Sequence, residues 1–265
     1  MGPSFTLKKR LASMLKVDFR RMFTMPIYYI MVGIAIVIPI LILVMTTMMA
    51  GTESIDRVTG EVVIMEQMFT NVWQAIATIP SQSQEMTMDV TTMCNIDMMF
   101  FATAVLLCLF VSDDFRSGYA KNLFTMRINK VDYVISKTLV GFVGGVSMLL
   151  GYFIGAMLGG KMAGLSFALF DVNVINVCMC LFSKMFLVLI FVPIFLVMSV
   201  VGKHRAWLSI LLALGSSMLL FTMVSMISPL NATIINVVLS AVGGIIFSIG
   251  IGAISNIVLK KTRLV

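Results

Sequence analysis

The sequence predicts an all-α integral membrane protein with six transmembrane helices, and three observations lead to this prediction. Hydrophobic residues make up 60% of the 265-residue chain and charged residues only 12%. The mean hydropathy of +1.05 is too high for a soluble core of this size to bury. The apolar residues gather in six runs, each close to the roughly 20 residues that a helix needs to cross a bilayer. These runs are Ile27–Met49, Ile96–Val111, Thr138–Gly159, Met185–Val201, Trp207–Ile227 and Ile234–Leu259.

The basic residues are shared unevenly between the two sides that six crossings would define. Sixteen of the nineteen Lys and Arg lie on the side of the two termini, whereas eight of the twelve acids lie on the other side. The positive-inside rule therefore predicts a multi-pass protein of the plasma membrane with both termini in the cytoplasm. The net charge of +7 reports this topology and does not indicate a nucleic-acid partner.

The segment before the first run has an amphipathic pattern. Its apolar residues recur at steps of three and four between basic ones: Leu7, Leu11, Met14, Leu15, Phe19, Met22 and Phe23. This spacing predicts a helix over residues 1–26 that lies in the membrane interface with its apolar face in the lipid. The whole chain, 1–265, is expected to form a single transmembrane domain, with an outer loop region at 50–95 and a cytoplasmic segment at 113–137.

The outer side has two unusual stretches. Region 50–95 is acidic, is too long for a plain connection and is expected to form short helices, including one around Trp73. The stretch Lys161–Ser183 is expected to lie along the outer interface. Lys184 is interpreted as a residue that extends to the outer membrane surface, in preference to one that pairs with a substrate, and Asp97 as a residue near water.

Small residues form faces in the third and sixth runs. Glycines fall four apart in the third run, and Ser240, Gly244, Ser248 and Gly252 do so in the sixth. Such faces let helices approach closely where lipid provides no hydrophobic drive, so they indicate a packed bundle.

No motif indicates catalysis or a metal. The stretch Gly155–Met162 fits the start of a phosphate-binding loop, but Met162 replaces the residue that holds magnesium and the segment follows a helix on the outer side. A methionine cluster beside Cys94 suits Cu(I), although methionine is equally common inside the runs, where it packs. A disulfide from Cys94 to Cys178 or Cys180 is allowed, and free thiols are the simpler interpretation.

The charged stretch 113–137 separates the second and third runs. Asp113 and Asp114 are expected to favour the N-terminus of a short helix, and Gly118 permits a turn. The helix would carry Tyr119, Leu123 and Met126 on one face. A short amphipathic helix of this kind between two spans is a docking element for a partner protein.

This arrangement resembles the permease subunit of ABC-2 type transporters, with a type V exporter-like fold. Similar permeases carry an acidic residue, a glycine, a short coupling helix, an arginine and a lysine that opens the third span. The matching residues are Asp113 or Asp114, Gly118, Leu123 to Met126, Arg127 and Lys137. The acid is Asp where many relatives have Glu, and Met126 stands where a proline is often found. The stretch GYAKN, Gly118 to Asn122, looks most like the same stretch of permeases for peptide-antibiotic and bacteriocin immunity or export.

The resemblance implies an exporter of amphipathic or antimicrobial peptides or other hydrophobic compounds. This chain would bind no cofactor and have no enzyme activity, because two copies of a separate ABC ATP-binding subunit would hold ATP and Mg²⁺. The permease would form a homodimer in membrane lipid. The alternatives are a lipid-linked glycan exporter and a membrane assembly or signalling protein without transport.

The resemblance also implies two sets of functional residues. Coupling to the ATPase subunit would use Asp113, Asp114, Arg116, Gly118, Leu123, Met126 and Arg127. The translocation path at the dimer axis would be lined by Phe23, Tyr28, Tyr29, Met218, Phe221 and Met223.

Overall fold

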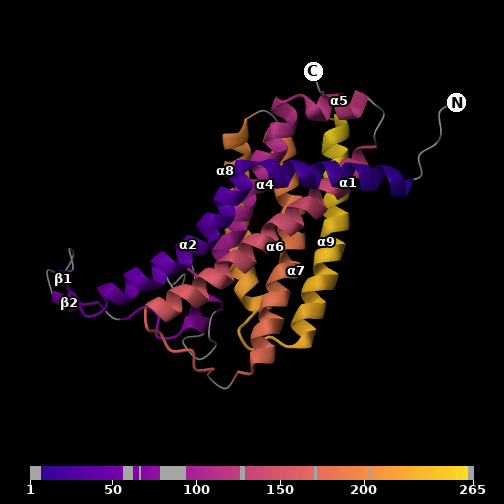
Figure 1. Cartoon of the computed structure of the whole chain (residues 1–265). Coiled ribbons are helices and arrows are strands. Elements are labelled where there is room, and N and C mark those ends of the chain that lie inside the picture. The colour runs from indigo at the N-terminus through magenta and orange to yellow at the C-terminus, as the bar shows by residue number, and fades with distance from the viewer. Residues whose placement is uncertain are drawn as a thin grey trace.

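The computed structural model shows a bundle of long helices with a shorter helix lying across one end (Figure 1). It describes residues 7–55, 62–65, 67–77, 94–125, 129–169, 172–202 and 205–261. The α-helices are α1 (Leu7–Thr24), α2 (Pro26–Met49), α4 (Met99–Arg116), α5 (Tyr119–Thr125), α6 (Lys130–Met162), α7 (Val174–Gly202), α8 (Ala206–Ile227) and α9 (Ile234–Lys261). The shorter elements are the strands β1 (Glu53–Ile55) and β2 (Val62–Ile64) and the 3₁₀ turns η1 (Val72–Ala75) and η2 (Ile96–Met98).

The prediction of a mostly helical, multi-pass membrane protein is confirmed. Among the described residues, five helices are long and apolar enough to cross a membrane: α2, η2 with α4, α6, α7 and α9. The apolar stretch found in α8 is shorter, Ala206–Phe221, although the helix itself has 22 residues. A sixth crossing through α8 therefore remains a prediction.

Both termini lie at the same end of the bundle, together with α5, and the β1–β2 hairpin lies at the far end of α2 (Figure 1). We call these the α5 end and the hairpin end. The third apolar run is only the middle of α6, which has 33 residues and is about 50 Å long at 1.5 Å per residue. That length exceeds a hydrocarbon core of roughly 30 Å, so the charged start of α6 extends beyond it.

The position of α1 differs in one respect from the prediction. The helix lies across the bundle, as an interfacial helix would (Figure 1). Part of its predicted lipid face, however, packs on the protein, because Met14 and Met22 are buried and α1 lies against α6, whereas Phe23 is 40% exposed. The apolar spacing of α1 thus serves a protein contact.

Glycines set the closest helix contacts, as the small-residue faces predicted. A Cβ on Gly155 of α6 would overlap the carbonyl oxygen of Ile36, and one on Gly159 would lie 2.8 Å from the Cα of Ile40, so α2 crosses α6 backbone to backbone. On α9, a Cβ on Gly244 would lie 2.9 Å from the carbonyl oxygen of Phe186 in α7. The glycines of the phosphate-loop-like stretch are therefore packing residues.

The hairpin end is only partly helical. Strands β1 and β2 pair antiparallel, with Ser54 opposite Val63, and the residues around Trp73 form the short turn η1. The indole Nε1 of Trp73 donates to the carbonyl oxygen of Phe167 at 3.2 Å, which joins η1 to the segment after α6. The prediction of a helix in this region is wrong for Val62–Ile64, which form strand β2. The stretch Lys161–Ser183 was predicted to lie along the outer interface. Its last ten residues, 174–183, instead form the start of the long helix α7, which begins at Val174.

Candidate functional site

The acidic pair of the 113–137 segment lies in the last turn of α4, which continues to Arg116. The prediction that Asp113 and Asp114 begin the next helix is therefore wrong. A carboxylate at a helix C-terminus is destabilised by the helix dipole by roughly 0.3–1 kcal/mol, so other contacts must stabilise it there. Asp114 has those contacts in the interior of the protein.

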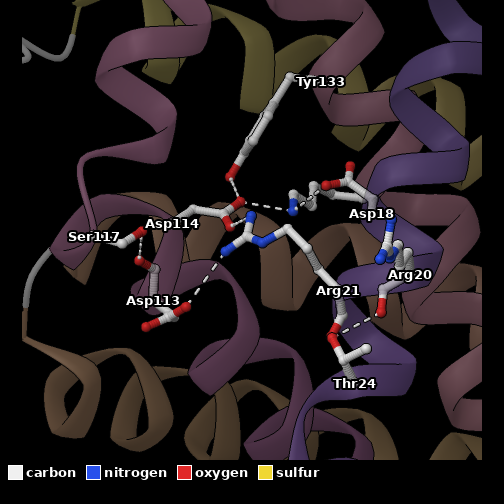
Figure 2. A network of polar contacts seen from close by, with 9 residues as sticks. Asp18, Arg20, Arg21, Thr24, Asp113, Asp114, Ser117 and Tyr133 are labelled. Atoms are coloured by element: carbon white, nitrogen blue, oxygen red, sulfur yellow. Dashed lines mark hydrogen bonds and ion pairs between the residues drawn. The ribbon is translucent and has the colours of Figure 1, made fainter.

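Asp114 is the centre of a buried network of charged side chains at the α5 end. Its Oδ1 accepts from Nη1 of Arg21 at 2.5 Å, and its Oδ2 lies 2.7 Å from Nζ of Lys137. The hydroxyl of Tyr133 donates to Oδ2 at 2.9 Å. Figure 2 shows the carboxylate enclosed by Tyr133 on one side and Arg21 on the other. One acid thus contacts residues of both α1 and α6.

Asp18 of α1 is the second buried acid of the network. Its Oδ1 accepts from Nζ of Lys137 at 2.9 Å, and its Oδ2 accepts from the hydroxyl of Ser136 at 2.6 Å. Lys137 therefore lies between two carboxylates, with its Nζ also 3.9 Å from the ring centroid of Phe110. Asp18, Asp114 and Lys137 have no exposed surface.

Opposite charges and filled hydrogen-bonding sites offset the cost of burying these side chains. An isolated buried ion is strongly destabilising, and a buried pair is tolerated when its remaining hydrogen-bonding sites are filled. Arg21 adds a second cation to the network. Its Nη2 donates to Oδ2 of the half-exposed Asp113 at 3.3 Å. Partial burial lowers the pKa of Arg21, but the charge and hydrogen bond of Asp114 raise it more, so the pKa is above its ordinary value. The network, defined as Asp18, Arg21, Asp113, Asp114, Tyr133 and Lys137, joins α1, α4 and α6.

Helix α5 contacts this network through two aromatic rings. The guanidinium Cζ of Arg21 lies 4.1 Å from the ring centroid of Tyr119, a cation–π distance, and Phe124 meets Tyr133 edge-on at 5.4 Å. Gly118 has φ of +74° and forms the turn from α4 into α5, so the turn predicted there is confirmed. Burial of Tyr119, followed by the charges of Asp18 and Asp114, raises the pKa of its phenol.

The predicted coupling residues differ in exposure. Arg116 is exposed, Leu123 is half-buried against the core, and Asp114 is inaccessible. Met126 and Arg127 lie outside the described residues. The exposed face of α5 consists of Lys121, Asn122 and Thr125. Thr125 lies within the predicted coupling helix, Leu123 to Met126, whereas Lys121 and Asn122 lie before it.

The predicted path residues lie in two separate groups. Phe23, Tyr28 and Tyr29 form a chain of edge-on rings where α1 meets α2, with Tyr28 buried and Tyr29 60% exposed. On α8, Met218 is 42% exposed, whereas Phe221 is buried against Phe101 of α4 at 5.5 Å. The side chain of Met223 lies outside what the structure describes. Helix α2 packs mainly on α6, and α8 packs on α4 and α7, so the two groups lie on different helix contacts of the bundle.

The interpretation of Lys184 as a residue at the membrane surface is wrong. Its Nζ lies 2.5 Å from Oδ1 of Asp97, and both side chains are buried between η2 and α7. The backbone around Asp97 is fixed by a helix cap, because the N–H of Asp97 donates to Oδ1 of Asn95 at 2.9 Å. A second buried ion pair therefore joins η2 to α7 at the hairpin end.

The sequence contained a signal for the network that the pattern of charges alone did not reveal. Asp18 is the single acid within 7–24, and it falls four residues from both Met14 and Met22 on the apolar face of that helix. A charge on a buried face requires a partner, which predicts a buried cation opposite Asp18. The structure shows that this cation is Lys137, two turns into α6.

A disulfide finds no support in the structure, and most of the methionine cluster beside Cys94 lies outside the described residues. No group of three or more His, Cys, Asp or Glu side chains is placed to hold a metal among the described residues. The four cysteines are free, and burial raises the pKa of Cys94, which makes its thiol less reactive.

No protein-family model, no curated protein and no solved structure matches this chain. The candidate site therefore rests on its own geometry: a buried charge network, flanked by a short helix with an exposed face.

Proposed function

We propose that this chain is the membrane subunit of an ATP-driven ABC exporter of the ABC-2 type, acting as a homodimer with two copies of a separate ATP-binding subunit. The cargo is an amphipathic or antimicrobial peptide or another hydrophobic compound. The protein lies in the plasma membrane, crosses it six times, and has its termini and α5 in the cytoplasm.

The observation that carries this proposal is the contact of α5 with the charge network. A docking helix transmits motion only if it is joined to elements that resist deformation. Tyr119 and Phe124 provide that connection, since they contact Arg21 and Tyr133, which both bond to Asp114. A displacement of α5 would therefore move α1, α4 and α6 together.

The exposure of α5 supports a refined set of docking residues. Lys121, Asn122 and Thr125 face outward, and Arg116 is exposed one turn earlier. We assign these residues to the ATPase contact. Asp114 takes a positioning role instead, because a fully buried carboxylate cannot reach a partner.

The unpaired apolar surfaces of α2 and α8 support an oily route for the cargo. Large side chains along both helices are exposed, including Tyr29, Leu41 and Met48 on α2 and Leu211 and Leu219 on α8. A slot formed where two copies meet would be apolar and free of fixed charge, which suits amphipathic peptides and excludes small hydrophilic solutes.

The test is purification of the tagged chain from its native membrane in mild detergent, followed by assay of ATP hydrolysis. The proposal predicts that an ATPase co-purifies and that amphipathic peptides stimulate it. A variant with Lys121→Glu and Asn122→Glu should lose the ATPase, while Lys9→Glu, on the exposed side of α1, should keep it. An intact chain that brings no ATPase would favour an assembly or signalling role, and stimulation by lipid-linked glycans alone would favour glycan export.

A further inference from the structure

A groove of about 530 Å³ opens between α6, α7 and α9 in the half of the bundle nearest α5. Its wall consists mainly of aliphatic side chains: Val134, Ile135, Leu189, Ile245 and Ile249, with Gly252. This volume lies within the roughly 300–1,000 Å³ of small-molecule sites. The groove is separate from the charge network and from the proposed peptide route.

The groove exists because the small-residue face of α9 contacts α7 over only part of its length. Ser240 bonds Ser183 at 2.6 Å, and the hydroxyl of Ser248 donates to the carbonyl oxygen of Leu189 at 2.6 Å. One turn later, a Cβ on Gly252 would meet only Val134 of α6, at an ordinary 3.6 Å. A small residue at this position is therefore not required by helix packing, and it leaves the groove open.

The groove has one polar end. Oδ1 of Asn256 is buried there and accepts no hydrogen bond from the described residues. One turn beyond Asn256, Nζ of the half-buried Lys130 donates to the carbonyl oxygen of Leu259 at 2.8 Å. No acidic side chain is among the described residues that line the groove. A carboxamide thus stands at the end of the apolar groove, and an ammonium that is bonded to the last turns of α9 lies one turn beyond it.

We propose that this groove binds an anionic phospholipid of the surrounding bilayer. An acyl chain occupies the aliphatic part, the phosphate lies at Lys130, and a glycerol hydroxyl donates to Asn256. The match is one of charge and depth, because the groove wall is apolar while Lys130, a cation, is the first residue of α6, at the α5 end. This binding does not depend on the proposed transport function.

The test uses the full chain in detergent, titrated with phosphatidylglycerol or with phosphatidylcholine of the same acyl chains, and native mass spectrometry to count bound lipid. We expect one phosphatidylglycerol to be retained per chain, with at least tenfold preference over phosphatidylcholine. Gly252→Leu should fill the groove and weaken retention at least tenfold. Gly250→Leu is the matched control, since a Cβ on Gly250 meets open space on the same helix.

Lys130→Gln tests the headgroup contact without filling the groove, and it should reduce the preference for phosphatidylglycerol to about one. Equal retention in Gly252→Leu and Gly250→Leu would overturn the proposal. So would the absence of any preference in the unmodified chain, or retention of an amphipathic peptide in place of phospholipid.

Discussion

Nζ of Lys137 lies 2.7 Å from Oδ2 of Asp114, and both side chains are completely buried. This contact joins α4 to α6, and the bonds of Arg21 and Asp18 add α1 to the same unit. Helix α1, although it precedes the bundle in the sequence, is thus held by ion pairs inside the protein.

Removing the carboxylate of Asp114 should destabilise the fold strongly. Asp114→Asn leaves Arg21 and Lys137 with less negative charge around them, and breaking a buried ion pair costs about 3–5 kcal/mol. Unfolding in denaturant, followed by circular dichroism in detergent, measures the change. Asp113→Asn is the control, because Asp113 is half-exposed and should cost under about 1 kcal/mol. Equal effects of the two substitutions would contradict the central position of Asp114.

The pair of Lys184 and Asp97 should show strong coupling between its two members. Lys184→Met or Asp97→Leu alone leaves one unpaired buried charge, at a cost of about 3–5 kcal/mol each. The double variant removes both charges and should recover much of that loss. A double-mutant cycle of unfolding free energies measures the coupling. Additive losses would show that the two side chains act independently.

The crossing of α2 over α6 should not tolerate a single methyl group. Gly155→Ala places a Cβ against the backbone of Ile36 and should cost about 1–3 kcal/mol, the usual penalty for overpacking. Gly33→Ala, on α2, meets nothing within 4 Å and should be neutral or stabilise by up to about 1 kcal/mol. Thermal unfolding of both variants measures the difference. Similar melting temperatures would mean that the helices cross further apart.

Tyr119 should resist ionisation at high pH. Burial raises the pKa of its phenol above the ordinary value of 10.0, so the folded state favours the neutral form. Its contribution to stability is therefore fully present below pH 10 and is lost as pH rises through the raised pKa. The absorbance difference between the wild-type chain and Tyr119→Phe during an alkaline titration measures this pKa. A midpoint at or below 10 would contradict the burial of the ring near Asp18 and Asp114.

Features that depend on the order of residues along one helix were predictable from the sequence. Hydropathy located the membrane helices, and four-residue glycine spacing located the close-packing face of α6, because both depend on local sequence. Helix ends were less predictable. Charged residues that pair in three dimensions, such as Asp114 and Lys137, let α4 and α6 extend beyond their apolar runs.

The buried ion pairs were missed because each partner was interpreted separately. A lone lysine near a span end is ordinarily a residue that reaches the membrane surface. Lys184 does not reach it, since Asp97 lies 87 positions earlier in the chain and comes close only in the folded bundle. Long-range pairs of this kind cannot be found by a window that moves along the sequence.

The most direct test of the account is crosslinking from α5 in the native membrane. A photoreactive amino acid at the exposed Asn122 should yield an adduct with an ATP-binding subunit, and the same group at the exposed Glu53 of the hairpin end should not. An adduct from position 122 that contains a nucleotide-binding protein is the predicted result. Labelling of position 122 by a membrane-impermeant reagent added outside intact cells, or an adduct without such a protein, would contradict it.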